Sequence, residues 1–143
     1  MNLDTFLTKI ETIALANSFK TFKSKLLFDG MIADTELPSL LIELKGAERG
    51  GEGLNVKYEQ NLDFHFLIKR TAQKPAIVLL DLINTLNNAI LNDYQLKGRI
   101  ENGELNIGDI DYSNEIGGLE KKSFFSATQN IKFTTHGYGK GNC

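Results

Sequence analysis

The segment "NLDFHFLIKR" at residues 61–70 constrains the fold most strongly, because its apolar and polar side chains alternate. Alternation of this kind is typical of a β-strand that buries one face and exposes the other. The side chains that share the apolar face are Leu62, Phe64, Phe66 and Ile68, whereas His65 lies on the opposite face. We therefore predict a strand within residues 54–69 with an aromatic inner face and with His65 exposed to solvent.

Two other segments repeat their apolar side chains every three or four residues, which is the spacing of an amphipathic helix. The first segment lies at residues 3–15, and the second lies at residues 76–90, directly after Pro75. Proline suits the first turn of a helix, and Asn2 or Asp4 suits the N-cap of the first helix. Both segments carry a broad apolar stripe, so we expect two helices that cover the sheet.

Shorter apolar runs in the first third of the chain predict two further strands, at residues 21–28 and 39–45. The second of these runs follows Pro38 and precedes the glycine-rich stretch "GAERGGEG" at residues 46–53. Because glycine loses the most conformational entropy when it is ordered, this stretch is expected to form a flexible hairpin loop.

The last third of the chain predicts a hairpin and a final strand. The stretch "KGRIENGELNIGDIDYS" contains Asn102-Gly103, a dipeptide that suits a tight hairpin turn. The apolar positions change parity near Gly108, which predicts a bulge there. The final strand lies at residues 123–138. Its predicted inner face consists of Phe125, Ala127, Gln129, Ile131, Phe133 and Thr135.

The order of helix, strands, helix and strands predicts an α+β fold with a mostly antiparallel sheet and two main helices packed on one face. We expect a single domain at residues 1–138 and a flexible tail at residues 139–143. The chain has 143 residues, 41% of them hydrophobic, which is enough for a core without disulfides. Cys143 is the one cysteine, so no internal disulfide can form.

Charge and hydropathy argue against two classes of protein. The longest apolar run, "AIVLL" at residues 76–80, is far shorter than the roughly 20 residues of a membrane-spanning helix. The N-terminus also lacks the pattern of an export signal, so we expect a cytoplasmic protein that contacts no membrane. With 16 basic and 18 acidic residues the net charge is −2, and no overall positive field attracts nucleic acid.

Four side chains could form a metal-dependent active site. His65 and His136 both have the outward parity of their strands, and Asp109 and Asp111 lie two residues apart. However, two histidines without a third ligand at a characteristic spacing are typical of solvated strand residues, and strand alternation alone explains the spacing of the aspartates. The sequence also has no nucleophile elbow and no phosphate-binding loop. We therefore expect no catalytic residue, no metal and no cofactor.

A cluster of lysines and phenylalanines supports a second hypothesis, a small nucleic-acid-binding module. The lysines are Lys20, Lys23 and Lys25, and the phenylalanines are Phe19, Phe22 and Phe28. Such a face could combine phosphate attraction with base stacking. Acidic side chains follow closely at residues 29, 34 and 36, which favours a solvated or interfacial lysine face instead.

Six segments, in their order along the chain, resemble one known family. They are the amphipathic opening helix, "LPSLLIELKG", the glycine-rich loop, "KYEQNLDFHFLIKR", "PAIVLLDLINTLNNAI" and "ATQNIKFTTHGY". Together they resemble the tail-terminator proteins, also called tail-completion or neck proteins, of long-tailed bacteriophages and Mu-like prophages. The resemblance covers roughly residues 3–138 and depends on the order, length and composition of the elements.

The resemblance implies a small α+β subunit without catalytic activity that forms a ring, expected to be a hexamer, on the last ring of the tail tube. The ring stops tube growth and presents a surface to the head–tail connector protein, and DNA passes through it. Its location would be the bacterial host cytoplasm during assembly and the tail neck of the virion. By position, contacts with the neighbouring subunit or with the tail tube protein would fall on Glu48, Arg49 and Glu52 within loop 46–53.

A ring subunit must also expose strand edges and apolar strips that a monomer would cover. We consider Leu67, Val78 and Leu82 as candidates for the contacts between subunits. A cyclic ring uses two different patches on each subunit, and charges on the loop could select the correct end of the tube.

Overall fold

The computed structural model describes residues 1–25, 34–52, 55–69, 73–112 and 124–136. These residues form an α+β fold with three α-helices and a five-stranded, mostly antiparallel mixed sheet, which confirms the predicted fold class. The elements in chain order are α1 (Leu3–Ala16), β1 (Thr21–Lys25), the 3-10 helix η1 (Asp34–Glu36), β2 (Ser39–Glu52), β3 (Asn55–Lys69), α2 (Pro75–Asn92), α3 (Tyr94–Glu101), β4 (Leu105–Asp111) and β5 (Phe124–His136).

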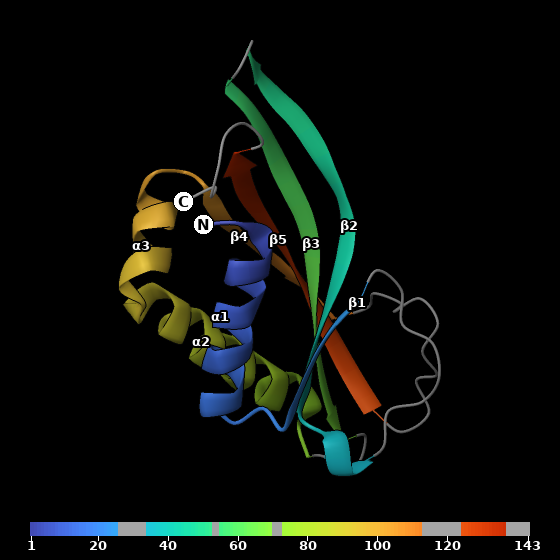
Figure 1. The fold of residues 1–143 in the computed structure, drawn as a ribbon. Coiled ribbons are helices and arrows are strands. Elements are labelled where there is room, and N and C mark those ends of the chain that lie inside the picture. The colour runs from blue at the N-terminus through green and yellow to red at the C-terminus, as the bar shows by residue number, and fades with distance from the viewer. Residues whose placement is uncertain (26–33, 53–54, 70–72, 113–123, 137–143) are drawn as a thin grey trace.

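The sheet has the strand order β1-β2-β3-β5-β4. β1 pairs with β2 in parallel, whereas each of the other neighbouring pairs is antiparallel. The helices lie on one side of this sheet, and β2 and β3 form a long hairpin that extends beyond them (Figure 1). The sheet therefore has one face covered by helices, called the helical face below, and one opposite face.

Both predicted main helices form, and their ends follow from local chemistry. α1 begins at Leu3 because the side chain of Asn2 accepts a hydrogen bond from the N–H of Thr5 at 2.8 Å. α2 begins at Pro75, whose missing N–H costs nothing in the first turn. The residues that these helices bury are Phe6, Ile10 and Ala14 of α1 and Leu79, Ile83, Leu86 and Ile90 of α2.

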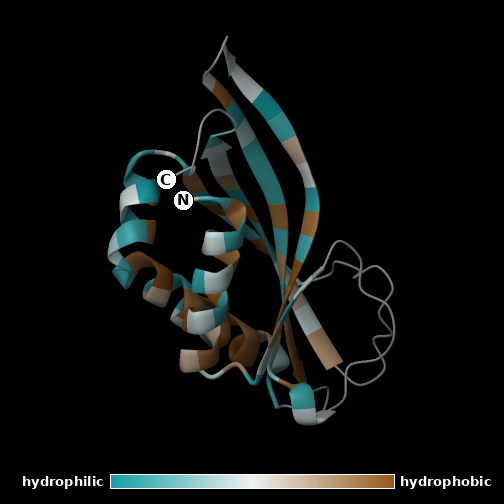
Figure 2. Cartoon of the chain, viewed as in Figure 1, coloured by the Kyte–Doolittle hydropathy of each residue, from teal (hydrophilic) through white to brown (hydrophobic). Residues whose placement is uncertain are grey.

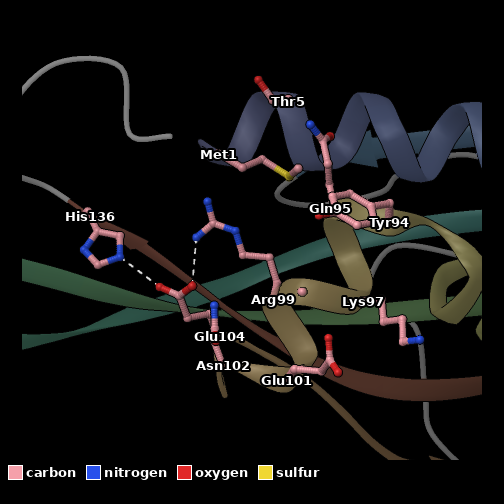
Figure 3. A pocket seen from close by; sticks show the side chains of 11 residues that line it. Met1, Thr5, Tyr94, Gln95, Lys97, Arg99, Glu101, Asn102, Glu104 and His136 are labelled. Atoms are coloured by element: carbon pink, nitrogen blue, oxygen red, sulfur yellow. Dashed lines mark hydrogen bonds and ion pairs between the residues drawn. The ribbon is translucent and has the colours of Figure 1, made fainter.

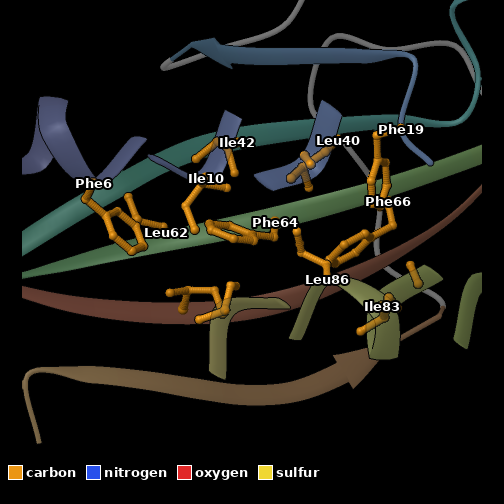
Figure 4. Close-up of a cluster of buried hydrophobic side chains, with 14 of the residues drawn as sticks. Phe6, Ile10, Phe19, Leu40, Ile42, Leu62, Phe64, Phe66, Ile83 and Leu86 are labelled. Carbon is orange, nitrogen blue, oxygen red and sulfur yellow. The ribbon is translucent and has the colours of Figure 1, made fainter. Parts of the chain in front are cut away.

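The main core fills the space between the helices and the sheet. The predicted inner face of β3 is confirmed, because Leu62, Phe64, Phe66 and Ile68 are all buried. Across this core Phe6 stacks on Phe133 with 4.2 Å between the ring centroids and an interplanar angle of 11°. Figure 4 shows this cluster, and Figure 2 shows that hydrophobic residues concentrate where the helices meet the sheet.

A second, smaller cluster lies on the opposite face of the sheet and consists of Leu37, Leu41, Leu67 and Phe124. Phe124 belongs to β5, whose predicted inner face placed Phe125 in the core. Phe125 is instead 37% exposed, so its predicted burial is wrong. The remaining residues of that predicted face, from Ala127 to Thr135, are buried as expected.

A short helix, α3, replaces the first half of the predicted hairpin around Asn102-Gly103, so that prediction is wrong. The side chain of Asp93 starts this helix by accepting hydrogen bonds from the N–H groups of Gln95 and Leu96. Leu96 is the one fully buried residue of α3. The sequence of this segment therefore carries no apolar stripe that would predict a helix.

Gly103 ends α3 and turns the chain into β4. Its φ of +74° lies in the left-handed region that glycine adopts readily. The N–H of Gly103 donates to the carbonyl of Ile100 at 3.0 Å, and the N–H of Glu104 donates to the carbonyl of Arg99 at 2.8 Å. These two bonds form a Schellman motif. The dipeptide therefore joins a helix to a strand, not one strand to another.

The predicted bulge near Gly108 is confirmed, since the register between β4 and β5 shifts between Ile107 and Ile110. A Cβ atom at Gly108 would lie 2.7 Å from the carbonyl oxygen of Asn130. No side chain fits at that distance. Glycine therefore allows β4 to approach β5 closely at the bulge.

Residues 46–52 of the glycine-rich stretch form part of a strand and not a loop, which corrects the sequence prediction for them, whereas residue 53 lies outside the described residues. β2 continues through it to Glu52 and pairs with β3 down to Glu52–Asn55. A register shift between Leu44 and Gly46, where Gly46 has a φ of +151°, lets the strand continue. Backbone pairing with β3 thus outweighs the entropy that glycine loses.

The other predicted strands form with altered ends. β1 begins at Thr21 as predicted, and residues 26–28 of the predicted strand lie outside the described residues. The predicted tail at residues 139–143 also lies outside them. Among the described helices, none combines the length and the hydropathy that a membrane crossing requires.

Candidate functional site

The opposite face of the sheet carries a buried polar cluster around His65. His65 does lie opposite the aromatic face of β3, but it is only 1% exposed, so the prediction of a solvated histidine is wrong. Its register partners are Leu41 on β2 and Thr128 on β5. The next row of the same face consists of Glu43, Asp63 and Asn130, which are register partners in the same way.

Hydrogen bonds join these two rows. Nδ1 of His65 lies 2.7 Å from Oγ1 of Thr128, and Nε2 lies 2.8 Å from Oε1 of Glu43. The side-chain amide of Asn130 donates to Oδ1 of Asp63 at 3.2 Å. Carboxylate, imidazole and hydroxyl stand in the order that activates a nucleophile in hydrolases. The hydroxyl of Thr128 is buried, however, because this residue is 3% exposed, and a buried oxygen cannot reach a substrate.

The two histidines do not form a shared site. β3 and β5 pair as required, but His65 lies opposite Thr128 whereas His136 lies opposite Lys57, at the far end of the same strand pair. Asp109 and Asp111 lie on β4 and are both exposed. In the described part of the chain, the three potential ligands that converge are instead Glu43, Asp63 and His65. Sequence spacing did not reveal Glu43, because it comes from another strand.

A pocket of about 720 Å³ lies between the start of α1, α3 and the ends of β4 and β5 (Figure 3). Its lining includes Tyr94, Gln95 and Lys97 of α3 together with the start of α1. At one end Glu104 receives a hydrogen bond from Nη1 of Arg99 at 3.0 Å. Nε2 of His136 lies 2.9 Å from the other carboxylate oxygen of Glu104. Arg99 and His136 therefore contact the two oxygens of the same carboxylate.

The two partners of Glu104 determine its acidity. Burial raises the pKa of Glu104, but the hydrogen bond with His136 and the charge of Arg99 outweigh burial, so the pKa is lower than its ordinary value of 4.5. A carboxyl whose pKa is lower in the folded state stabilises the fold above its unfolded pKa. This stabilisation disappears as the pH falls through the folded pKa.

Replacing Glu104 with glutamine is therefore expected to lower the free energy of unfolding by about 1–2 kcal/mol at neutral pH, since charged hydrogen bonds are lost. The difference from the unmodified chain should shrink as the pH falls well below 4.5. Urea denaturation over that pH range measures it. Glu101→Gln, an exposed change in the same pocket, should change the stability by less than about 0.5 kcal/mol. A difference for Glu104→Gln that does not depend on pH would contradict this account.

The lysine cluster of the nucleic-acid hypothesis is partly neutralised. Lys20 is exposed, but Nζ of Lys23 lies 2.9 Å from a carboxylate oxygen of Glu36. The side chain of Lys25 lies outside the described residues. A paired lysine attracts phosphate less than a free one, so this geometry does not favour the hypothesis.

The candidate contact residues fall into three groups. Glu48 and Arg49 are exposed on the β2–β3 hairpin, and the side chain of Glu52 lies outside the described residues. Val78 and Leu82 are half-buried and pack against the main core. Leu67 is 0% exposed, which removes it from the candidates for an exposed contact.

Other apolar side chains are more exposed than these candidates. On the two main helices they are Leu15 of α1 and Ile77, Leu80 and Leu91 of α2. Leu80 lies within the predicted amphipathic helix at residues 76–90, but 39% of it is exposed. An apolar stripe wider than the core can cover leaves such residues at its margin.

Comparison with known proteins found no family model and no curated protein that matches this chain.

Proposed function

We propose that this chain is a structural subunit that assembles into a ring, as in the tail-terminator class that its sequence resembles. In this role it caps the tail tube of a long-tailed phage or prophage, stops tube growth and contacts the head–tail connector, without catalysis. The observation that carries the proposal is the open edge of β2. β1 pairs only with residues Ser39 to Glu43 of β2, so Leu44 to Glu52 have no strand partner on that side among the described residues.

An open strand edge of this length is a template for pairing with another chain. The hairpin edge carries Lys45, Glu48 and Arg49, all exposed. Such charges prevent indiscriminate pairing of edges, and they still permit a partner with complementary charges. The edge is thus suited to a specific neighbour, and the hairpin carries it beyond the helices (Figure 1).

A ring also requires a second, different patch on each subunit. β4 forms the opposite end of the sheet, so the described strands offer two separate edges. The exposed side chains of Ile77, Leu80 and Leu91 add an apolar contribution on the helical side. One subunit can therefore meet the next through unlike surfaces, as closure of a ring demands.

The mass of the purified full chain in solution tests this proposal. We expect a closed ring, with six subunits as the resemblance implies, in native mass spectrometry and in sedimentation equilibrium at high protein concentration. The variant Arg49→Glu changes an exposed charge on the hairpin and should prevent ring formation without a change in melting temperature. Lys97→Glu reverses an exposed charge on α3 and should leave the ring intact.

Two results would contradict the proposal. The first is a single-subunit mass at every concentration together with no association with tail tubes. The second is binding to DNA that is strong at low salt and falls steeply as salt is added, because phosphate contacts release counterions. That second result would favour the nucleic-acid-binding alternative with its Lys20, Lys23 and Lys25 face.

A further inference from the structure

The polar cluster on the opposite face contains three side chains with the donor atoms of a metal site. One oxygen of Glu43, one oxygen of Asp63 and one ring nitrogen of His65 all lie within 4.8 Å of one another. Zinc holds nitrogen and oxygen ligands at about 2.0–2.2 Å in a tetrahedron, so two donors on one ion are about 3.4 Å apart. Small side-chain rotations are therefore enough to bring all three donors onto one ion.

Neighbouring residues already orient two of these donors. His65 is buried, and its Nδ1 lies 2.7 Å from Oγ1 of Thr128, which leaves Nε2 directed at the carboxylates. A histidine that binds a metal commonly donates its other ring N–H to an oxygen in this way. The side-chain amide of Asn130 donates to Oδ1 of Asp63 at 3.2 Å, so a hydrogen bond also orients this carboxylate.

The charges of the cluster favour a cation. Glu43 and Asp63 are direct register partners across β2 and β3, and like charges in that position destabilise an antiparallel pair. Lys45 lies 3.8 Å from Glu43, but its side chain is 45% exposed, and an exposed ion pair contributes little. A divalent ion between the two carboxylates would offset their repulsion.

From these contacts we infer that Glu43, Asp63 and His65 bind a divalent transition-metal ion, with zinc as the best match to one imidazole and two carboxylates. The ion would bridge β2 and β3 at the base of the long hairpin. A mixed nitrogen and oxygen donor set favours zinc over magnesium, which prefers oxygen ligands alone. The inference does not depend on the ring proposed above.

Zinc would bind Nε2 of His65, which lies 2.8 Å from Oε1 of Glu43. A ring nitrogen that binds a metal carries no proton, so the neutral imidazole would keep its proton on Nδ1. That N–H would donate to Oγ1 of Thr128, which lies 2.7 Å away.

Equilibrium dialysis of the purified full chain against zinc chloride, followed by elemental analysis, tests the site. We expect one zinc ion for each chain and a higher melting temperature with zinc. The variants His65→Gln and Asp63→Asn should each weaken zinc binding at least tenfold. His136→Gln changes the other histidine, which is bound to Glu104 at 2.9 Å, and should keep the stoichiometry and affinity.

Asp63→Asn keeps the shape of the side chain, so it provides a test even when a histidine variant fails to fold. Circular dichroism confirms the fold of each variant before dialysis. Less than stoichiometric zinc in the unmodified chain would overturn the inference. It would also be overturned by zinc binding that survives Asp63→Asn but is lost in His136→Gln.

Discussion

Replacing Phe64 with alanine is expected to lower the free energy of unfolding by about 3–5 kcal/mol. Phe64 is fully buried in the main core, and Figure 4 shows it among Ile10 of α1 and Leu86 of α2. Its removal leaves a cavity at the place where both helices meet the central strand. Because domains of this size are stable by only about 5–15 kcal/mol, a large fraction of the stability would be lost.

Urea denaturation followed by circular dichroism measures this effect. Tyr94→Ala removes an aromatic side chain that is 91% exposed, and this control should change the stability by less than about 0.5 kcal/mol. Similar stabilities for the two variants would show that β3 does not bury its aromatic face between the helices and the sheet.

Replacing Leu67 with alanine is expected to lower the free energy of unfolding by about 2–5 kcal/mol, although Leu67 lies on the face opposite the helical face. The side chain packs in the small cluster with Leu37, Leu41 and Phe124. The sequence prediction of Leu67 as a subunit contact implies a different result, namely a stable monomer that no longer assembles. Denaturation of the monomer in dilute solution separates the two outcomes.

Leu15→Ala is the matched control, because Leu15 is 48% exposed on α1. It should change the stability by less than about 0.5 kcal/mol. If Leu67→Ala were equally mild in the monomer, the second cluster would not stabilise the fold, and Leu67 would return as a candidate for an intersubunit contact.

Periodicity predicted the elements whose side chains are buried on one side over many residues. β3 places apolar side chains on one face from Leu62 to Ile68, and α2 repeats its apolar residues from Leu79 to Ile90. Both patterns reflect the burial of apolar side chains, and the hydrophobic effect that favours this burial is the dominant favourable term in folding. For that reason the sequence predicted their type and their inner faces together.

Elements that are held by other interactions were not predictable in this way. α3 buries only Leu96, and its ends depend on the side chain of Asp93 and on the left-handed conformation of Gly103. The outer half of β2 is glycine-rich and is held by pairing with β3. Pairing between strands is not visible in the composition of either strand alone.

The candidate metal site shows the same limit. Parity placed His65 and Asp63 on one face of β3, and it was correct. The contribution of Glu43 depends on the register between β2 and β3, which sets it opposite Asp63. Burial of His65 depends on its neighbours Leu41 and Thr128, which come from two other strands. A single sequence does not reveal the register between β2 and β3 or the register between β3 and β5.

The irregularity between Leu44 and Gly46 decides which side each hairpin charge faces. Before it, even-numbered residues of β2 are register partners of even-numbered residues of β3, as in Leu44–Leu62. Beyond it, Arg49 pairs with Tyr58 and Glu48 pairs with Glu59, so odd-numbered residues of β2 continue the helical side. Removal of one residue at this position would exchange the two faces of the outer hairpin. Deletion of a single codon would thus move Arg49 to the face that Glu48 now occupies and Glu48 to the face of Arg49. The strand residues before the deletion would keep their register and their buried faces.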